Sequence, residues 1–286
     1  MGIFSNRSLV PIHIGGYLSG NLCHLAAKDV RLAPVPARSV EGWRSVLNQL
    51  PKGPKTLRLL LSSECYEVIT VDRPNVEEQE LVAALTWSVK DLSAIPLEHQ
   101  QIDYFELKVQ PAGPKKLQVV VADRRKIQPL VALLHGLKVQ VELITIEEIA
   151  LTNLMPKDER PHLMLCQLQE NRLSLLVSVA GEFVLQRPIN GVVFAEGQDE
   201  LTRQTQFDAM TLELQRSLDY LDRQLRMPMP VSMSLLLPVE LQQWLEPRIQ
   251  SLFDLPVESI ASADRDVVNC IVASVLTEQP EVQHEA

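Results

Sequence analysis

One order of apolar segments occurs twice along the chain, and this repetition limits the possible folds more than any other feature. Each copy begins with three short predicted strands, which cover residues 9–14, 22–27 and 30–35 in the first half and residues 162–168, 173–179 and 182–188 in the second. A helix and a further strand follow in both copies. The repeat therefore predicts an α/β protein with two similar lobes, each a mixed sheet flanked by helices.

A segment with a different order of predicted elements interrupts the first copy. Residues 65–107 predict a strand, a helix and another strand, and the earlier pattern resumes with a strand over 117–122. The polar, proline-flanked stretch 155–161 is the best boundary in the chain. We therefore expect a first lobe over 1–155 with an inserted subdomain at 65–107, and a second lobe over 156–286.

Composition excludes several classes of protein. The 27 basic and 36 acidic residues give a net charge of -9, so no basic field is available to hold a nucleic acid. No apolar run approaches the roughly 20 residues of a membrane helix, and the first residues lack the apolar core of a signal peptide. The four scattered cysteines are typical of reduced, buried thiols in a cytoplasmic protein.

Glycines near the start of the chain form the only candidate ligand loop. Gly15, Gly16 and Gly20 have the spacing of a phosphate loop, but Asn21 and Leu22 follow where a lysine and a hydroxyl residue would be needed. A tight turn between two strands explains the same glycines. We expect at most a vestigial nucleotide loop here.

Other chemical motifs are missing or have simpler explanations. The six histidines include no HExxH pair, the serine near Gly20 is not in a GxSxG context, and Cys23 and His24 point to opposite faces of a strand. A long helix over 199–226 carries an apolar stripe, which is typical of a core helix, with a partner-binding helix as the alternative. The sequence therefore predicts neither a metal site nor nucleophilic catalysis.

Two stretches of sequence resemble a known family. Trp87 to Phe105 reads WSVKDLSAIPLEHQQIDYF, and Glu213 to Leu225 reads ELQRSLDYLDRQL. Together with the duplicated order of elements, they resemble PilM-type proteins, the cytoplasmic actin-like components of type IV pilus assembly. The two stretches are most similar to those of the members that serve mannose-sensitive haemagglutinin (MSHA) pili.

The resemblance implies a duplicated actin-like (ribonuclease H-like) fold with an inserted subdomain in the first lobe. It also implies docking on the cytoplasmic N-terminal tail of a PilN-like single-pass membrane protein. Nucleotide-binding members carry an aspartate where this chain has His13, followed by Ile14 and Gly15. The matching position of the second loop is Cys166 or Gln167, and the expected glycine pair of the third motif is replaced by Pro238 and Val239.

These departures predict a degenerate nucleotide site that takes neither ATP nor magnesium, because no carboxylate is available to hold the hydrated metal. The expected function is that of a non-catalytic scaffold in the cytoplasm, held at the inner membrane through its partner; an ATP-binding switch of the same machine is the alternative. The expected peptide site is a groove between the subdomain that carries Trp87 and the rest of the first lobe, although Trp87 itself could belong to the core. Self-association is left open.

Overall fold

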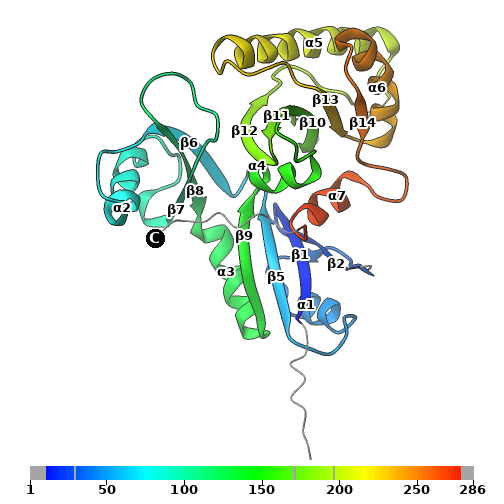
Figure 1. Ribbon diagram of the computed structural model, residues 1–286. Helices are drawn as coiled ribbons and strands as arrows, with labels where there is room; N and C mark the ends of the chain where they lie inside the picture. The colour runs from blue at the N-terminus through cyan, green and yellow to red at the C-terminus, as the bar shows by residue number, and fades with distance from the viewer. Residues whose placement is uncertain (1–10, 29, 170–171, 196, 278–286) are drawn as a thin grey trace, which may run out of the picture.

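The computed structural model describes residues 11–28, 30–169, 172–195 and 197–277 (Figure 1). Within these residues the strands form a six-stranded, a five-stranded and a three-stranded sheet. The six-stranded sheet lies below the five-stranded sheet in Figure 1, and the three-stranded sheet lies to their left. Most helices cover the outer faces of these sheets.

The six-stranded sheet is built by the first half of the chain. Its strand order is β3-β2-β1-β5-β9, and β4 pairs with β2. β1 runs antiparallel to β2 and parallel to β5, which in turn runs parallel to β9. The strands are β1 (Ile12–Ser19), β2 (Leu22–Ala27), β3 (Val30–Arg31), β4 (Val35–Pro36), β5 (Lys55–Leu61) and β9 (Val139–Ile146).

Both faces of this sheet are covered. Leu57, Leu59 and Leu61 of β5 belong to a core with α1 (Val40–Leu47) and α3 (Arg124–Gly136), whereas Leu60 belongs to a different core. Neighbouring residues of a strand point to opposite faces, so a strand that is covered on both sides, such as β5, carries apolar residues at consecutive positions, here 59–61.

The three-stranded sheet is the inserted subdomain. Its order is β6-β8-β7, and both pairings are antiparallel. The elements are β6 (Tyr66–Asp72), α2 (Glu78–Val89), η1 (Leu97–His99), β7 (Gln100–Glu106) and β8 (Lys116–Asp123). The strand expected over 117–122 is therefore the centre of this sheet and not a return to the first lobe. The subdomain ends at Asp123, one strand beyond the expected end at Leu107.

The second half of the chain repeats the order of the first. Its sheet has the order β12-β11-β10-β13-β14, with the first two pairings antiparallel and the last two parallel, which matches β3-β2-β1-β5-β9 strand for strand. The predicted duplication is confirmed. The elements are β10 (Pro161–Gln169), β11 (Arg172–Val179), β12 (Glu182–Pro188), α5 (Glu200–Arg223), β13 (Ser232–Leu236), α6 (Val239–Phe253), β14 (Val257–Ser259) and α7 (Val267–Ser274).

A separate apolar core joins the two halves. It combines Tyr17 and Leu60 of the first sheet with Met164 and Leu176 of the second. α4 (Glu147–Ala150), η2 (Leu151–Leu154) and α7 complete it. α4 is one α-helical turn, and the 3-10 turn η2 follows it directly. Although α7 comes last among the described elements, it packs on β1 and β2 of the first sheet.

Three further sequence predictions can be compared with the structure. All four cysteines are free and buried, as expected. The apolar stripe of α5 packs in the core of the second half, as predicted for that helix. Trp87 is 68% exposed on α2, so it does not belong to the core. The described residues contain no helix with both the length and the apolar character needed to span a membrane.

Candidate functional site

The hairpin between β1 and β2 contains the predicted glycine loop but not in the expected form. Gly15 and Gly16 lie inside β1, paired with Ala26 and Leu25 of β2, and only Gly20 lies in the turn, with φ of 56°. The predicted turn over 15–20 is therefore wrong. The backbone N–H of Gly20 donates to a carboxylate oxygen of Glu64 at 3.0 Å. A group that would face a phosphate in a nucleotide loop is thus already bound to an anionic side chain.

Gly15 and Gly16 are explained by packing. A β-carbon on Gly15 would lie 2.8 Å from the carbonyl oxygen of Val272 in α7, and one on Gly16 would lie 3.2 Å from the sulfur of Cys23. α7 can therefore approach the backbone of β1 only because residue 15 has no side chain. Gly15 therefore does have a structural role, but that role is to permit the contact with a helix.

His13 lies at the opposite end of β1 from the turn. Six residues separate it from Ser19, which corresponds to about 20 Å of extended strand. Its Nδ1 atom lies 2.8 Å from the hydroxyl of Thr56 and 3.3 Å from the carboxylate of Glu142. His13 therefore lies within β1 and not in the hairpin turn, and its match with the aspartate of nucleotide-binding members stays a prediction.

The residue expected in the second loop lies within a strand as well. Cys166 lies inside β10, fully buried, with its thiol 3.6 Å from the carbonyl oxygen of Ser174, and Gln167 follows it in the same strand. Burial raises the pKa of the Cys166 thiol. At the start of β11, Arg172 reaches across to the first half and donates to the hydroxyl of Ser63.

Pro238 and Val239 begin α6. Pro238 precedes the first helical turn, and its carbonyl oxygen accepts the N–H of Gln242 at 3.0 Å. The buried amide of Gln242 donates to the carbonyl oxygen of Ala261 at 2.8 Å and accepts the N–H of the same residue at 3.3 Å. This end of α6 is fixed to the segment after β14 by protein groups alone.

Two buried glutamates mark the point where the halves meet. Tyr17 of β1 donates its hydroxyl to Glu147 at 2.8 Å, and Tyr66 of β6 donates to Glu148 at 2.6 Å. The N–H of Glu147 also donates to the hydroxyl of Tyr66 at 3.2 Å. The first sheet, the inserted subdomain and the connection to the second half are therefore held by one hydrogen-bonded group, which we call the junction cluster (Tyr17, Tyr66, Glu147, Glu148).

Burial changes the protonation of this cluster. Removal from water raises the pKa of Glu147 to about 7 and also raises the pKa of Glu148, because a charged carboxylate is poorly solvated there. The same burial, with the neighbouring carboxylates, raises the pKa of both tyrosines. Sequence reasoning missed this cluster, although two consecutive glutamates between an apolar strand and an apolar turn were a visible signal.

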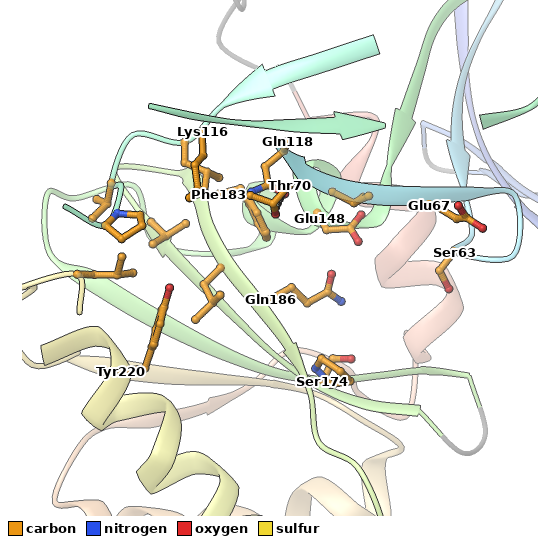
Figure 2. Close-up of a pocket in the computed structure, with 18 of the residues that line it drawn as sticks. Ser63, Glu67, Thr70, Lys116, Gln118, Glu148, Ser174, Phe183, Gln186 and Tyr220 are labelled. Carbon is orange, nitrogen blue, oxygen red and sulfur yellow. Dashed lines mark hydrogen bonds between the residues drawn. The ribbon is translucent and has the colours of Figure 1, made fainter. Parts of the chain in front are cut away.

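Two grooves flank the inserted subdomain. The first, of about 610 Å³, separates it from the second half and is bounded by β6 and β12, which are edge strands of their sheets (Figure 2). Thr70 and Gln118 lie on one side of this β6–β12 groove, with Gln186 and Tyr220 on the other. Glu148 of the junction cluster also lines this groove. Both polar and apolar side chains form its walls.

The second groove separates the inserted subdomain from the rest of the first lobe, where a peptide site was expected. It has a volume of about 760 Å³ and runs between β7 and β9, with α3 below. Both strands lie at the edge of their sheets within the described residues. Its walls are mainly apolar, with Ile102 from β7, Ile127 and Val131 from α3, and Ile144 from β9. Trp87 does not line this β7–β9 groove.

The fold was compared with those of known proteins. No family model and no curated protein sequence matches the chain. Among solved structures, a chain of a PilM-PilN type IV pilus biogenesis complex is similar with a TM-score of 0.64 and 15% identity, covering 96% of this chain and 100% of that one. A protein of Bacteroides thetaiotaomicron with an actin-like ATPase fold and unknown function is similar with a TM-score of 0.51 and 12% identity, covering 98% and 100%.

These likenesses establish the architecture. The protein has the actin-like fold, with two duplicated α/β halves and a subdomain inserted in the first. The fold class predicted from the sequence is thus confirmed. At these identities the comparison concerns the fold only.

Proposed function

We propose that this protein is a non-catalytic scaffold of a type IV pilus assembly machine, of the MSHA type. It acts in the cytoplasm, peripheral to the inner membrane, and docks on the cytoplasmic N-terminal tail of a PilN-like single-pass membrane protein. The fold likeness to a chain of a PilM-PilN pilus biogenesis complex supports this proposal over the whole length of the chain. The observation that carries it is the β7–β9 groove.

The groove suits an extended peptide. Each edge strand presents backbone N–H and C=O groups that have no partner strand in the described part of the chain. A peptide that adds to β7 or β9 gains main-chain hydrogen bonds, and its alternate side chains enter the apolar walls. Ile144 is 40% exposed although it is an isoleucine in a strand, as expected for a side chain that a partner covers.

The residues at the expected phosphate-binding loops support the role of a scaffold over that of a nucleotide-dependent switch. The turn amide of Gly20 is bound to Glu64, and neither Cys166 nor Gln167, the two candidates for the carboxylate position of the second loop, is acidic. Glu64 would repel a phosphate brought to this amide. An ATP-binding switch is the second candidate, favoured by the likeness to a protein with an actin-like ATPase fold.

The test is to measure docking directly. A synthetic peptide of the partner's N-terminal tail is titrated into the protein by calorimetry, and membrane co-purification is measured in cells whose partner lacks that tail. We expect the wild-type protein to bind the peptide and Ile144→Asp to bind it at least tenfold more weakly, because a carboxylate would enter the apolar groove. Leu212→Asp replaces another exposed aliphatic residue, on α5, and is the control that should bind with wild-type affinity. Unchanged co-purification without the tail would refute docking.

A further inference from the structure

The inserted subdomain carries apolar side chains on its outer surface. α2 buries Leu81, Leu85 and Val89 completely against the three-stranded sheet. Other apolar residues of α2 and of the segment after it are exposed, namely Val82, Trp87, Leu92 and Leu97. We call this set the α2 outer face.

These residues are not needed to hold the subdomain together. Three fully buried positions at four-residue steps already supply the contact between α2 and its sheet. Trp87 and Leu92 are 68% and 62% exposed, and the ammonium of Lys90 lies 4.6 Å from the centre of the Trp87 ring. An exposed tryptophan among exposed aliphatic residues is typical of an interface.

The charge around this face identifies the kind of partner. Residues 66–106 contain nine acidic side chains and only two basic ones, so most of the net charge of the chain is concentrated here. Both bases are engaged: Arg73 pairs with Glu78 and Glu106, and Lys90 lies near Asp91. Among the described residues, Glu77 and Glu80 at the start of α2 have no ion-pair partner. An anionic lipid surface or a nucleic acid would be repelled, whereas a basic segment would be attracted.

We infer that the α2 outer face binds the lysine- and arginine-bearing, membrane-proximal stretch of the same partner whose tail docks in the β7–β9 groove. This inference rests on the proposed function. Cytoplasmic segments next to a membrane span are enriched in lysine and arginine, so the partner supplies the required charge just beyond its docked tail. Its apolar side chains cover Trp87 and Leu92.

The two surfaces are close enough for one chain to use both. β7 forms one wall of the groove and α2 packs on β7. The axis of a helix lies about 10 Å above its sheet and the helix itself is about 10 Å across, so roughly 15 Å, or four to five extended residues, separate β7 from the far side of α2. A tail that leaves the groove over the edge of β7 therefore arrives at the α2 outer face.

The test compares two synthetic peptides of the partner by calorimetry: the whole cytoplasmic segment up to its membrane span, and a shorter one without the membrane-proximal lysines and arginines. We expect the long peptide to bind more tightly, with an advantage that falls as salt is raised. Trp87→Ala should weaken the long peptide about tenfold and leave the short one unchanged. The double variant Glu77→Gln, Glu80→Gln should remove part of the salt dependence.

Leu201→Ala, at another highly exposed leucine on a helix, is the matched control and should bind both peptides normally. Equal affinity of the two peptides, or a long peptide insensitive to Trp87→Ala, would overturn this inference while leaving docking in the groove intact. A long peptide that is sensitive to Trp87→Ala but not to Ile144→Asp would support the α2 outer face and refute the groove. Binding of the protein alone to vesicles of anionic phosphatidylglycerol, lost in Trp87→Ala, would overturn the assignment to a protein segment.

Discussion

Replacing Glu147 by glutamine should change how the stability of this protein depends on pH. Glu147 is buried in the junction cluster, and burial raises the pKa of its carboxyl from an ordinary value of 4.5 to about 7. In the unfolded chain the group regains its ordinary pKa. The folded state therefore binds a proton more tightly than the unfolded state, and the stability gained from this proton is fully present below pH 4.5 and lost as the pH rises through 7.

The magnitude follows from the size of the shift. One pKa unit corresponds to 1.36 kcal/mol, so the full loss between acid and alkaline pH is about 3 kcal/mol. About half of it, roughly 1.5 kcal/mol, falls between pH 5.8 and 8.2. This window avoids the isoelectric point near 5.2, where the protein would be least soluble. Glutamine keeps an oxygen that can accept the Tyr17 hydroxyl but has no proton to lose.

The assay is urea unfolding followed by tryptophan fluorescence at several pH values across that window. The free energy of unfolding of Glu147→Gln, minus that of the wild type, should rise with pH by about 1.5 kcal/mol. Glu142→Gln is the control, because a hydrogen bond from Arg58 lowers the pKa of Glu142 below its ordinary value of 4.5. This carboxylate stays ionised in the folded and the unfolded chain across the whole window, so the difference for Glu142→Gln should not change with pH. A difference for Glu147→Gln that stays flat, or falls with pH, would refute the account of a protonated buried carboxyl.

Two further predictions concern the β1 strand and the nucleotide. Gly15→Ala should lower the free energy of unfolding by about 1–3 kcal/mol in urea, because the new methyl group would meet the backbone of α7, whereas Gly136→Ala, with no heavy atom within 4 Å, should not destabilise the fold. Calorimetry with millimolar Mg-ATP should detect no binding, because Glu64 holds the turn amide of Gly20 and His13 lies far from that turn; a one-to-one isotherm in the micromolar range would favour the ATP-binding switch.

The sequence predicted the fold best where apolar residues recur in a regular pattern. The three-strand starts of both halves follow from apolar runs, and the duplicated strand order confirmed them. The boundary over 155–161, inferred from polar residues and prolines, stays a prediction. The return of the chain through β8 could not be read in this way, because a central strand of a small sheet and a strand of the main sheet have the same buried pattern.

The candidate site was harder to predict. A glycine marks either a turn or a close approach, and only the contact between Gly15 and α7, more than 250 residues apart, decides between them. Trp87 illustrates the same limit: a large aromatic residue in a helix with apolar neighbours is typical of a core, and only the packing of Leu81 and Leu85 shows that the ring faces outward. The junction cluster joins residues from separate elements, which no local pattern reveals.

The packing of α7 on β1 has a consequence for how the protein is made. During synthesis the first lobe leaves the ribosome long before α7, so the face of β1 and β2 that carries Tyr17 stays uncovered until α7 has been translated as well. An apolar sheet face of this kind invites chaperone binding on the nascent chain. A ribosome stalled before residue 267 would therefore present an incomplete first lobe. Degradation of such products would be directed at the uncovered sheet in the amino-terminal half.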